Sequence, residues 1–182
     1  IKTVATQERF ITTFRPIFHN VMLNTYFVAS EYVANYIKKS KKYDIENIIP
    51  VGQYRSDYIS FYKKGIIPEE ISKAKENGKK IIIALGWDSP EHWFESYINP
   101  FVNWSAQINF LEDIIRLSKL LNNTFIILRY KELEWMTNVF FEEILNKVNN
   151  CENIVISNNY KEVNYGYKLC ANADLIIAKH TS

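Results

Sequence analysis

The sequence predicts an α/β protein, with parallel sheets covered by helices on both faces. One observation is that residues 79–87 (KKIIIALGW) and 124–130 (TFIILRY) are continuous apolar runs, which is typical of strands buried on both sides. A second is that amphipathic helix patterns separate such runs, so strand and helix alternate along the chain. The composition agrees, because 182 residues with 47% hydrophobic and 23% charged side chains are ordinary for a globular protein.

The first part of the chain predicts two strands, a helix and a third strand. Residues 1–6 and 24–30 read as strands, and residues 47–52 (NIIPVG) as a short strand closed by a glycine. Between them, Ser30 is a natural N-cap for a helix whose first turn carries Glu31 and whose end is rich in lysine. This order is typical of the start of a parallel sheet.

Residues 53–78 predict a linker. Gly65, Pro68 and Gly78 punctuate the segment, and residues 69–77 form a polar helical stretch within it. We therefore expect one structural region over residues 1–52 and a second over residues 79–182.

The second region alternates regularly between strand and helix. The helix pattern over residues 105–123 places Phe110, Leu111, Ile114, Leu117 and Leu121 on one face, and Thr137 is the expected N-cap of a later helix. In chain order the predicted elements are a strand over 79–87, a helix over 105–123, a strand over 124–130, a helix over 137–150, a strand over 153–157, a helix over 165–173 and a strand over 174–179.

Charge and cysteine usage argue against several classes of protein. The 22 basic and 20 acidic residues leave a formal net charge of +2, and a phosphate-gripping basic stripe is not visible, so nucleic acid is not an expected partner. No apolar run reaches the length of about 20 residues needed to span a bilayer. The two cysteines, Cys151 and Cys170, are too few for a disulfide scaffold and favour a reducing cytoplasm.

Several common catalytic motifs do not occur. There is no Gly-x-Gly-x-x-Gly, no Walker Gly-Lys-Ser/Thr and no Gly-x-Ser-x-Gly. His19, His92 and His180 are far apart, and no Cys/His/Asp cluster has metal-ligand spacing, so neither a metal nor a cofactor is expected. These observations disfavour a dinucleotide oxidoreductase, a P-loop ATPase and a hydrolase triad.

A ligand site is expected at the carboxyl ends of the parallel strands of the second region. Each candidate also has a structural interpretation: Gly86 can serve a turn, Asp88 or Ser89 can cap a helix, Arg129 can form an ion pair, and His180 can pack. Together they share one edge, and hydroxyls at a helix start suit a diphosphate. The candidates are Gly86, Trp87, Asp88 and Ser89 after the first strand, Arg129 after the second, Asn158, Asn159 and Tyr160 after the third, and His180, Thr181 and Ser182 after the fourth.

Three stretches resemble a known family. YFVASEYVANYI and NIIPVGQYRSDY, at residues 26–37 and 47–58, resemble the junction between the two Rossmann-like domains of GT-B glycosyltransferases. The likeness is greatest to the branch with CDP-glycerol glycerophosphotransferases and related bacterial surface-polysaccharide enzymes. NADLIIAKHTS, at 172–182, is similar to the segment of that family whose hydroxyls meet the donor diphosphate. The matching positions are Ser30, Glu31, Gly52, Arg55, Asp57, Ala173, Asp174, Thr181 and Ser182.

The resemblance implies a transferase that moves a sugar or polyol phosphate from a nucleotide-activated donor to a glycan or lipid-linked acceptor. Residues 1–52 would be the C-terminal part of an N-terminal domain, and residues 79–182 the first part of a nucleotide-sugar-binding domain. The chain would be a fragment, inactive alone, that stops at the donor-phosphate turn. Its place would be the cytoplasm, or the inner face of the membrane.

The resemblance also implies roles for individual residues. Thr181 and Ser182 would contact the diphosphate, Arg129 would offer it positive charge, and residues 158–160 would line the base or ribose. Residues 86–89 would face an interdomain cleft, and Arg55 and Asp57 would mark the crossing between domains. Where the family often has Gln-His-Gly, this chain has Thr-Gln-Glu-Arg at 6–9, so the expected histidine base is missing. Glu8 is a weak substitute, since a surface ion pair explains it equally simply.

Two other interpretations stay open at this stage. One is a nucleotide-sugar epimerase of the same architecture, for which Glu8 and His180 would be the acid–base candidates. The other is a non-catalytic α/β binding module, in which Trp87, Trp93 and Trp104 would form a partner interface.

Overall fold

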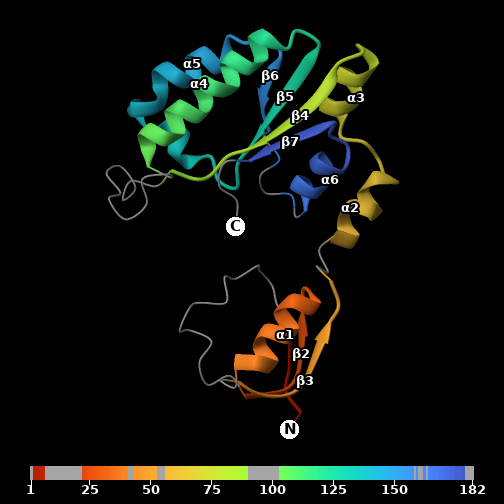
Figure 1. Cartoon of the computed structure of the whole chain (residues 1–182). Coiled ribbons are helices and arrows are strands. Elements are labelled where there is room, and N and C mark those ends of the chain that lie inside the picture. The colour runs from red at the N-terminus through yellow and green to blue at the C-terminus, as the bar shows by residue number, and fades with distance from the viewer. Residues whose placement is uncertain are drawn as a thin grey trace. The chain divides into compact units, whose positions relative to one another are not determined.

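The computed structural model describes residues 2–6, 22–40, 43–52, 56–89, 103–157, 159, 162 and 164–178 (Figure 1). The chain forms two compact units, Ile1–Asp57 and Tyr58–Ser182. The predicted domain boundaries at 52 and 78 stay a prediction.

The first unit is a three-stranded parallel sheet with one helix. Strands β1 (Val4–Thr6), β2 (Met22–Val28) and β3 (Asp44–Pro50) lie in the order β1-β2-β3, and Tyr26 is paired with both Ala5 and Ile48. Helix α1 (Glu31–Ser40) connects β2 to β3. The predicted N-cap is confirmed, because Ser30 Oγ accepts a hydrogen bond from the Val33 amide at 3.3 Å. Val28, Ala34 and Ile37 form the core between helix and sheet.

The second unit is built on a four-stranded parallel sheet in the order β6-β5-β4-β7. The four strands and three intervening helices predicted for this region are all present. In chain order the elements are α2 (Ser56–Lys63), α3 (Glu69–Glu76), β4 (Lys80–Leu85), α4 (Trp104–Leu120), β5 (Thr124–Arg129), the 3-10 turns η3 (Glu134–Thr137) and η4 (Val139–Phe141), α5 (Glu142–Asn149), β6 (Ile154–Ile156), α6 (Tyr165–Ala171) and β7 (Leu175–Ala178).

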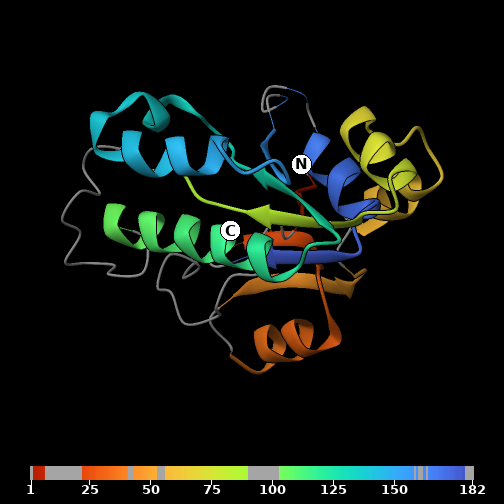
Figure 2. The ribbon, with the colours of Figure 1, turned by 90° about the horizontal axis from the view of Figure 1, so that it is seen from above.

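Helices cover both faces of this sheet (Figures 1 and 2). The α4 face carries α4 and α5, and Ile82 and Ala84 of β4 point into its core. The α3 face carries α3 and α6, and Ile81 and Ile83 point into that smaller core. The alternation follows from the two-residue period of a strand. Two parallel sheets, the second with helices on both faces, confirm the predicted α/β class and agree with a Rossmann-like arrangement.

Helix α4 begins where a local capping signal specifies it. Asn103 Oδ1 accepts a hydrogen bond from the Ala106 amide at 2.8 Å, which satisfies one of the free N–H groups of the first turn. Phe110, Leu111 and Ile114 are buried as expected from the helical spacing, whereas Leu121 is 40% exposed and lies just beyond the helix end.

The predicted helix over residues 137–150 was wrong in its first turn. Two 3-10 turns precede α5, and Thr137 is no N-cap, since its hydroxyl donates to the Glu134 carbonyl at 2.8 Å. Asn138 takes the capping role for the second turn, accepting from the Phe140 amide at 2.9 Å. Burial of Trp135 and Phe141 in the α4-face core explains the departure, because both rings must reach that core from a short segment.

The segment predicted as a linker with one helix contains a second helix, α2. Its aromatic rings support it locally: Tyr58 stacks near Tyr62 at 6.3 Å between ring centroids and meets Tyr167 of α6 at 5.6 Å. Among the helices that the structure describes, none combines the length and apolar character needed to cross a bilayer.

Candidate carboxyl-edge site

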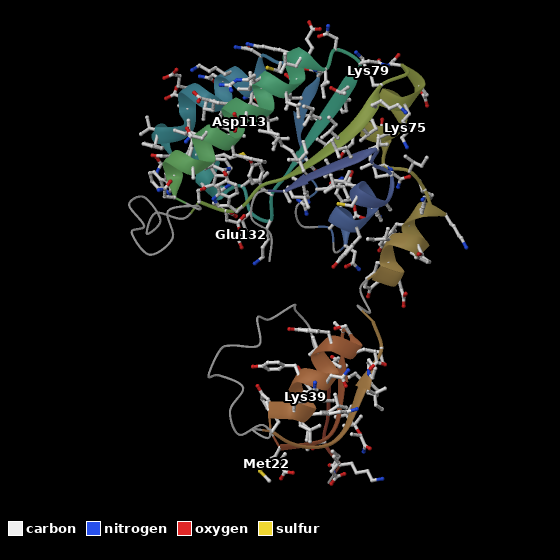
Figure 3. The ribbon with its side chains drawn as sticks, in the orientation of Figure 1. Met22, Lys39, Lys75, Lys79, Asp113 and Glu132 are labelled. Carbon is white, nitrogen blue, oxygen red and sulfur yellow. The ribbon has the colours of Figure 1, made fainter. Side chains whose placement is uncertain are left out.

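Three of the predicted loops meet at the carboxyl edge of the four-stranded sheet. The Gly86 amide donates to the Arg129 carbonyl at 3.0 Å, and the Ser157 amide donates to the Leu128 carbonyl at 2.9 Å. Asp88 Oδ1 accepts from the Glu132 amide at 2.9 Å, which ties the loop after β4 to the loop after β5. Figure 3 labels Glu132 at this edge and Lys79 at the opposite, amino edge.

The start of the first loop has a structural role. A Cβ on Gly86 would lie 2.0 Å from Cε1 of Tyr130. A glycine at this position therefore leaves room for that ring, and this contact explains it better than a turn does. Trp87 is buried and packs on Phe110 at 5.4 Å between ring centroids. Asp88 joins the two loops, and its capping of a following helix stays a prediction, because residues 90–102 lie outside the described residues. Donor binding by residues 86–89 stays a prediction.

Behind this loop the α4-face core contains a buried polar group. Tyr130 is 1% exposed and its ring meets that of Trp135 at 5.1 Å, yet its hydroxyl has no hydrogen-bond partner. Burial raises the pKa of Tyr130 well above its ordinary value, and the Gln107 side chain only partly opposes this rise. The phenol is therefore held neutral.

On the α3 face, the same edge carries a group of polar side chains, which we call the Arg129 cluster: Glu70, Arg129, Ser157, Asn159 and Tyr165. Ile127 and Val155 point to the α3 face, so the residues two positions on, Arg129 and Ser157, point there too. The β5–β6 register places them next to each other, since Leu128 is opposite Ile156. Glu70 and Tyr165 come from the first turns of α3 and α6.

Arg129 is the cation of this cluster. Burial lowers the pKa of its guanidinium, and Tyr165 and Glu70, which lie within electrostatic reach, act in the opposite direction. The ordinary pKa of arginine is so high that the group stays charged. The cluster therefore contains a charged, partly buried guanidinium, with the Glu70 carboxyl group in its neighbourhood.

The other members supply hydroxyl, amide and carboxylate groups. Burial raises the pKa of Tyr165, a hydrogen-bonding interaction with Asn159 opposes this, and Glu70 reinforces it. Ser157 is 2% exposed, and neither its hydroxyl nor the buried Oε1 of Glu70 has a hydrogen-bond partner. A buried polar atom without a partner costs about 1–3 kcal/mol, so this cluster has unused capacity for a polar ligand.

The arrangement suits the binding of an anion. A guanidinium offers several N–H donors in a planar fork that matches phosphate geometry, and the Ser157 and Tyr165 hydroxyls can donate beside it. A metal is not needed for this, and within the described ranges no three His, Cys, Asp or Glu side chains gather as a metal site would require.

Sequence reasoning found part of this cluster. Arg129 and Asn159 were predicted as site residues, whereas Glu70, Ser157 and Tyr165 were not. The sequence did contain a signal for Glu70 and Tyr165. Each lies in the first turn of a helix that leads into a parallel strand, and such helices begin at the carboxyl edge of the sheet. Glu8, Arg55, Asn158, Tyr160, His180, Thr181 and Ser182 lie outside the described residues.

Two other residues named by the family resemblance lie away from the cluster or on the surface. Asp174 precedes β7 at the amino edge, where its Oδ2 accepts from the Ile81 amide at 2.8 Å and its pKa is lowered chiefly by that hydrogen bond. Its role is to join β7 to β4. Asp57 is exposed in the first turn of α2.

Comparison of the chain with protein-family models, with curated proteins and with solved structures finds no match. The functional argument therefore rests on the chemistry and geometry of the Arg129 cluster, together with the motifs of the sequence.

Proposed function

We propose that the protein is a GT-B-type transferase that takes a sugar or polyol phosphate from a nucleotide donor, and that the Arg129 cluster binds a phosphate group of that donor. The observation that carries the proposal is a charged, half-buried guanidinium at the carboxyl end of a parallel strand, beside a buried hydroxyl that has no partner. Ligands of open parallel sheets bind at this edge.

For this reaction the protein must mainly hold the donor in position and stabilise the charge on the leaving group. For a sugar, the acceptor hydroxyl forms a bond to the sugar carbon as the carbon–oxygen bond to the nucleoside diphosphate breaks. For a polyol phosphate, it forms a bond to phosphorus as the P–O–P bond breaks and a nucleoside monophosphate leaves. In both cases negative charge grows on the leaving phosphate oxygen. Arg129 stabilises that charge, and Ser157 and Tyr165 donate hydrogen bonds to the non-bridging oxygens. Glu70 acts on the guanidinium electrostatically from α3. The acceptor would be a glycan or a lipid-linked glycan, with the reaction on the cytoplasmic side of the membrane.

Thermal and chemical unfolding with millimolar CDP-, UDP-, GDP- and dTDP-linked ligands tests the proposal. A ligand at about 100 times its Kd adds about 2.7 kcal/mol to the free energy of unfolding. We expect one nucleotide to stabilise the protein selectively. Arg129→Gln should weaken its binding by about tenfold or more, because a hydrogen bond to a charged group contributes about 1.5–3 kcal/mol.

Arg116→Gln is the matched control. Arg116 lies on α4 with a side chain that is 74% exposed, so its loss should leave both folding and nucleotide binding unchanged. Equal effects of the two arginine variants, or no stabilisation of the wild-type protein by any nucleotide, would contradict the proposal.

The second candidate is a non-catalytic binding module, and one observation, a group of aromatic side chains that includes an exposed ring, favours it. Phe61 is 69% exposed on α2, and its ring adjoins Tyr62 at 5.2 Å, with Tyr58 and Tyr167 nearby. The interface was predicted through Trp87, Trp93 and Trp104. Trp87 and Trp104 are buried in the α4-face core and cannot take part, and Trp93 lies outside the described residues. A well-folded chain that ignores every nucleotide would favour this candidate.

A further inference from the structure

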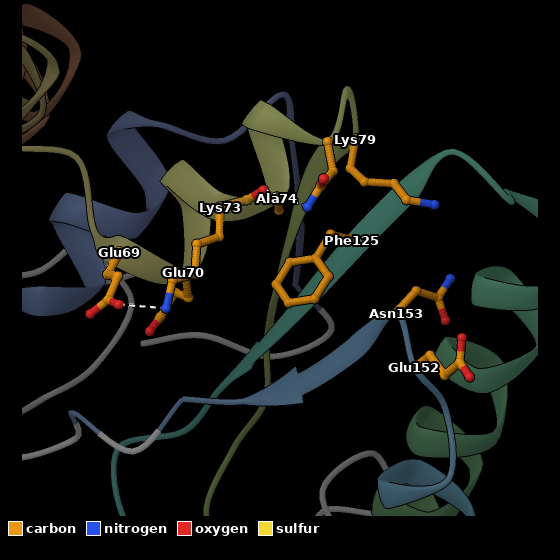
Figure 4. A pocket seen from close by; sticks show the side chains of 9 residues that line it. Glu69, Glu70, Lys73, Ala74, Lys79, Phe125, Glu152 and Asn153 are labelled. Carbon is orange, nitrogen blue, oxygen red and sulfur yellow. Dashed lines mark hydrogen bonds and ion pairs between the residues drawn. The ribbon is translucent and has the colours of Figure 1, made fainter.

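A separate hollow lies on the α3 face, between α3 and the turn that precedes β6. It has a volume of about 630 Å³, which is enough for a small organic molecule. Figure 4 shows the Phe125 ring in its middle, with α3 on one side and Glu152 and Asn153 on the other. We call it the α3 groove, and its lining residues are Glu69, Glu70, Lys73, Ala74, Asn77, Lys79, Phe125, Glu152 and Asn153.

The groove follows from how α3 packs. Ile71 and Ala74 pack toward β4, where they join Ile81 and Ile83 in the smaller core. Phe125 of β5 lies beyond that contact and is only partly buried against the same core. One face of an aromatic side chain is thereby left at the bottom of a polar-walled groove.

The donors of the groove walls are already engaged. Asn77 Nδ2 donates to the Lys73 carbonyl at 3.0 Å, and Asn153 Nδ2 donates to the Ser118 carbonyl at 2.9 Å. Each of the two ammonium groups has one such partner: Lys73 pairs with Glu69 at 2.5 Å, and Lys79 donates to the Asn122 carbonyl at 2.9 Å. Among the charged side chains of the lining, Glu152 forms neither an ion pair nor a hydrogen bond with the described residues.

The remaining acceptors are the oxygens of Glu70, Glu152, Asn77 and Asn153. The lining carries three carboxyl groups and two ammonium groups, and one of the carboxyl groups, that of Glu70, is shared with the Arg129 cluster. A matching ligand must donate hydrogen bonds, carry positive charge and offer an apolar body to the Phe125 ring. Cations bind aromatic faces favourably, which adds to the match.

We propose that the α3 groove binds a small free organic cation, an aliphatic chain that ends in an ammonium or guanidinium group. The chain lies on Phe125, and the cationic end pairs with Glu152. The groove shares Glu70 with the Arg129 cluster, but the proposed contacts are Phe125 and Glu152, so the proposal does not rest on the transferase function.

Titration with cadaverine and agmatine, followed by amide chemical shifts in NMR, tests the proposal. We expect saturable shifts confined to residues around Phe125, Glu152 and Asn153, which weaken as salt is raised because ion pairs at a surface are screened. 1-Pentanol and glutarate, a neutral and an anionic chain of similar length, should give no saturable shifts there. Equal binding of either would overturn the proposal.

Glu152→Gln is the decisive variant. Its side chain is exposed, so the fold should be retained, and loss of one exposed ion pair should weaken cation binding up to about fivefold. Glu112→Gln on α4 removes an exposed carboxylate elsewhere and should change nothing. An unchanged affinity in Glu152→Gln would overturn the assignment, as would tighter binding of a capped lysine or arginine peptide, which would identify a protein as the source of the cation.

The two proposals fail separately. Arg129→Gln should not weaken cadaverine binding, because it removes a positive charge near the shared Glu70, and Glu152→Gln should leave any nucleotide-dependent stabilisation unaltered.

Discussion

The two faces of the four-stranded sheet differ in what their residues do. The α4 face is a large core of aliphatic and aromatic side chains, in which Trp104, Trp135 and Phe141 meet edge to face or tilted at about 5 Å. The α3 face has a smaller core and carries both the Arg129 cluster and the α3 groove. We infer that the α4 face supplies most of the free energy of unfolding. The α3 face can therefore contain partly buried charged groups with little loss of stability.

The largest expected effect contrasts a phenylalanine from each face. Phe141→Ala should lower the free energy of unfolding by about 3–5 kcal/mol, because a fully buried ring leaves a cavity among its neighbours. Phe125→Ala should cost clearly less, since that ring is only partly buried at the groove. Urea unfolding of both variants measures the difference, and equal losses would show that the faces contribute alike.

A smaller effect concerns how tightly the α4 face is packed at the carboxyl edge. Gly86→Ala should cost about 1–3 kcal/mol, because the added methyl group meets the Tyr130 ring. Gly166→Ala on α6 is the matched control: a methyl group there meets nothing within 4 Å, and alanine favours a helix, so stability should hold or rise. A tolerated Gly86→Ala would mean that the ring moves aside freely.

The smallest effect concerns the buried phenol and appears at alkaline pH. The pKa of Tyr130 is raised in the folded state, so its contribution to stability is complete below the unfolded pKa of about 10 and declines as pH rises above it. The loss approaches about 1.4 kcal/mol per pH unit. Tyr130→Phe should remove this part of the alkaline slope and leave stability near pH 7 unchanged or slightly higher, because the hydroxyl has no partner.

Unfolding at a series of pH values from 8 to 11 measures this slope. Tyr32→Phe is the control, since that side chain is 76% exposed and its removal should leave the slope as in the wild-type protein. If Tyr130→Phe behaved as Tyr32→Phe does, the hydroxyl would have access to water in the native state.

Much of the fold could be predicted because its signals are local. The two-residue alternation of strands, the spacing of apolar residues in residues 105–123 and the cap at Ser30 all act within a few positions of the chain. Prediction failed where a tertiary contact outweighed the local signal. Trp135 and Phe141 form 3-10 turns because their rings are needed in the core, although Thr137 offers a plausible cap.

The candidate site could be predicted only in outline. The rule that ligands bind at the carboxyl edge pointed to Arg129 and Asn159, since both follow strands. Glu70 and Tyr165 are separated by almost a hundred positions, and their meeting depends on two helices packing on one face. The structural role of Gly86 likewise depends on a ring 44 positions away.

The sequence by itself determined that this protein is α/β, which segments are strands and at which edge of the sheet polar residues collect, because these properties depend on short-range periodicity and chain direction. Only the tertiary structure decided that the Arg129 guanidinium lies on the α3 face of that edge and the Tyr130 phenol on the α4 face. It also decided that a groove opens beside α3. Those features depend on burial and strand register, and both are properties of the packed chain as a whole.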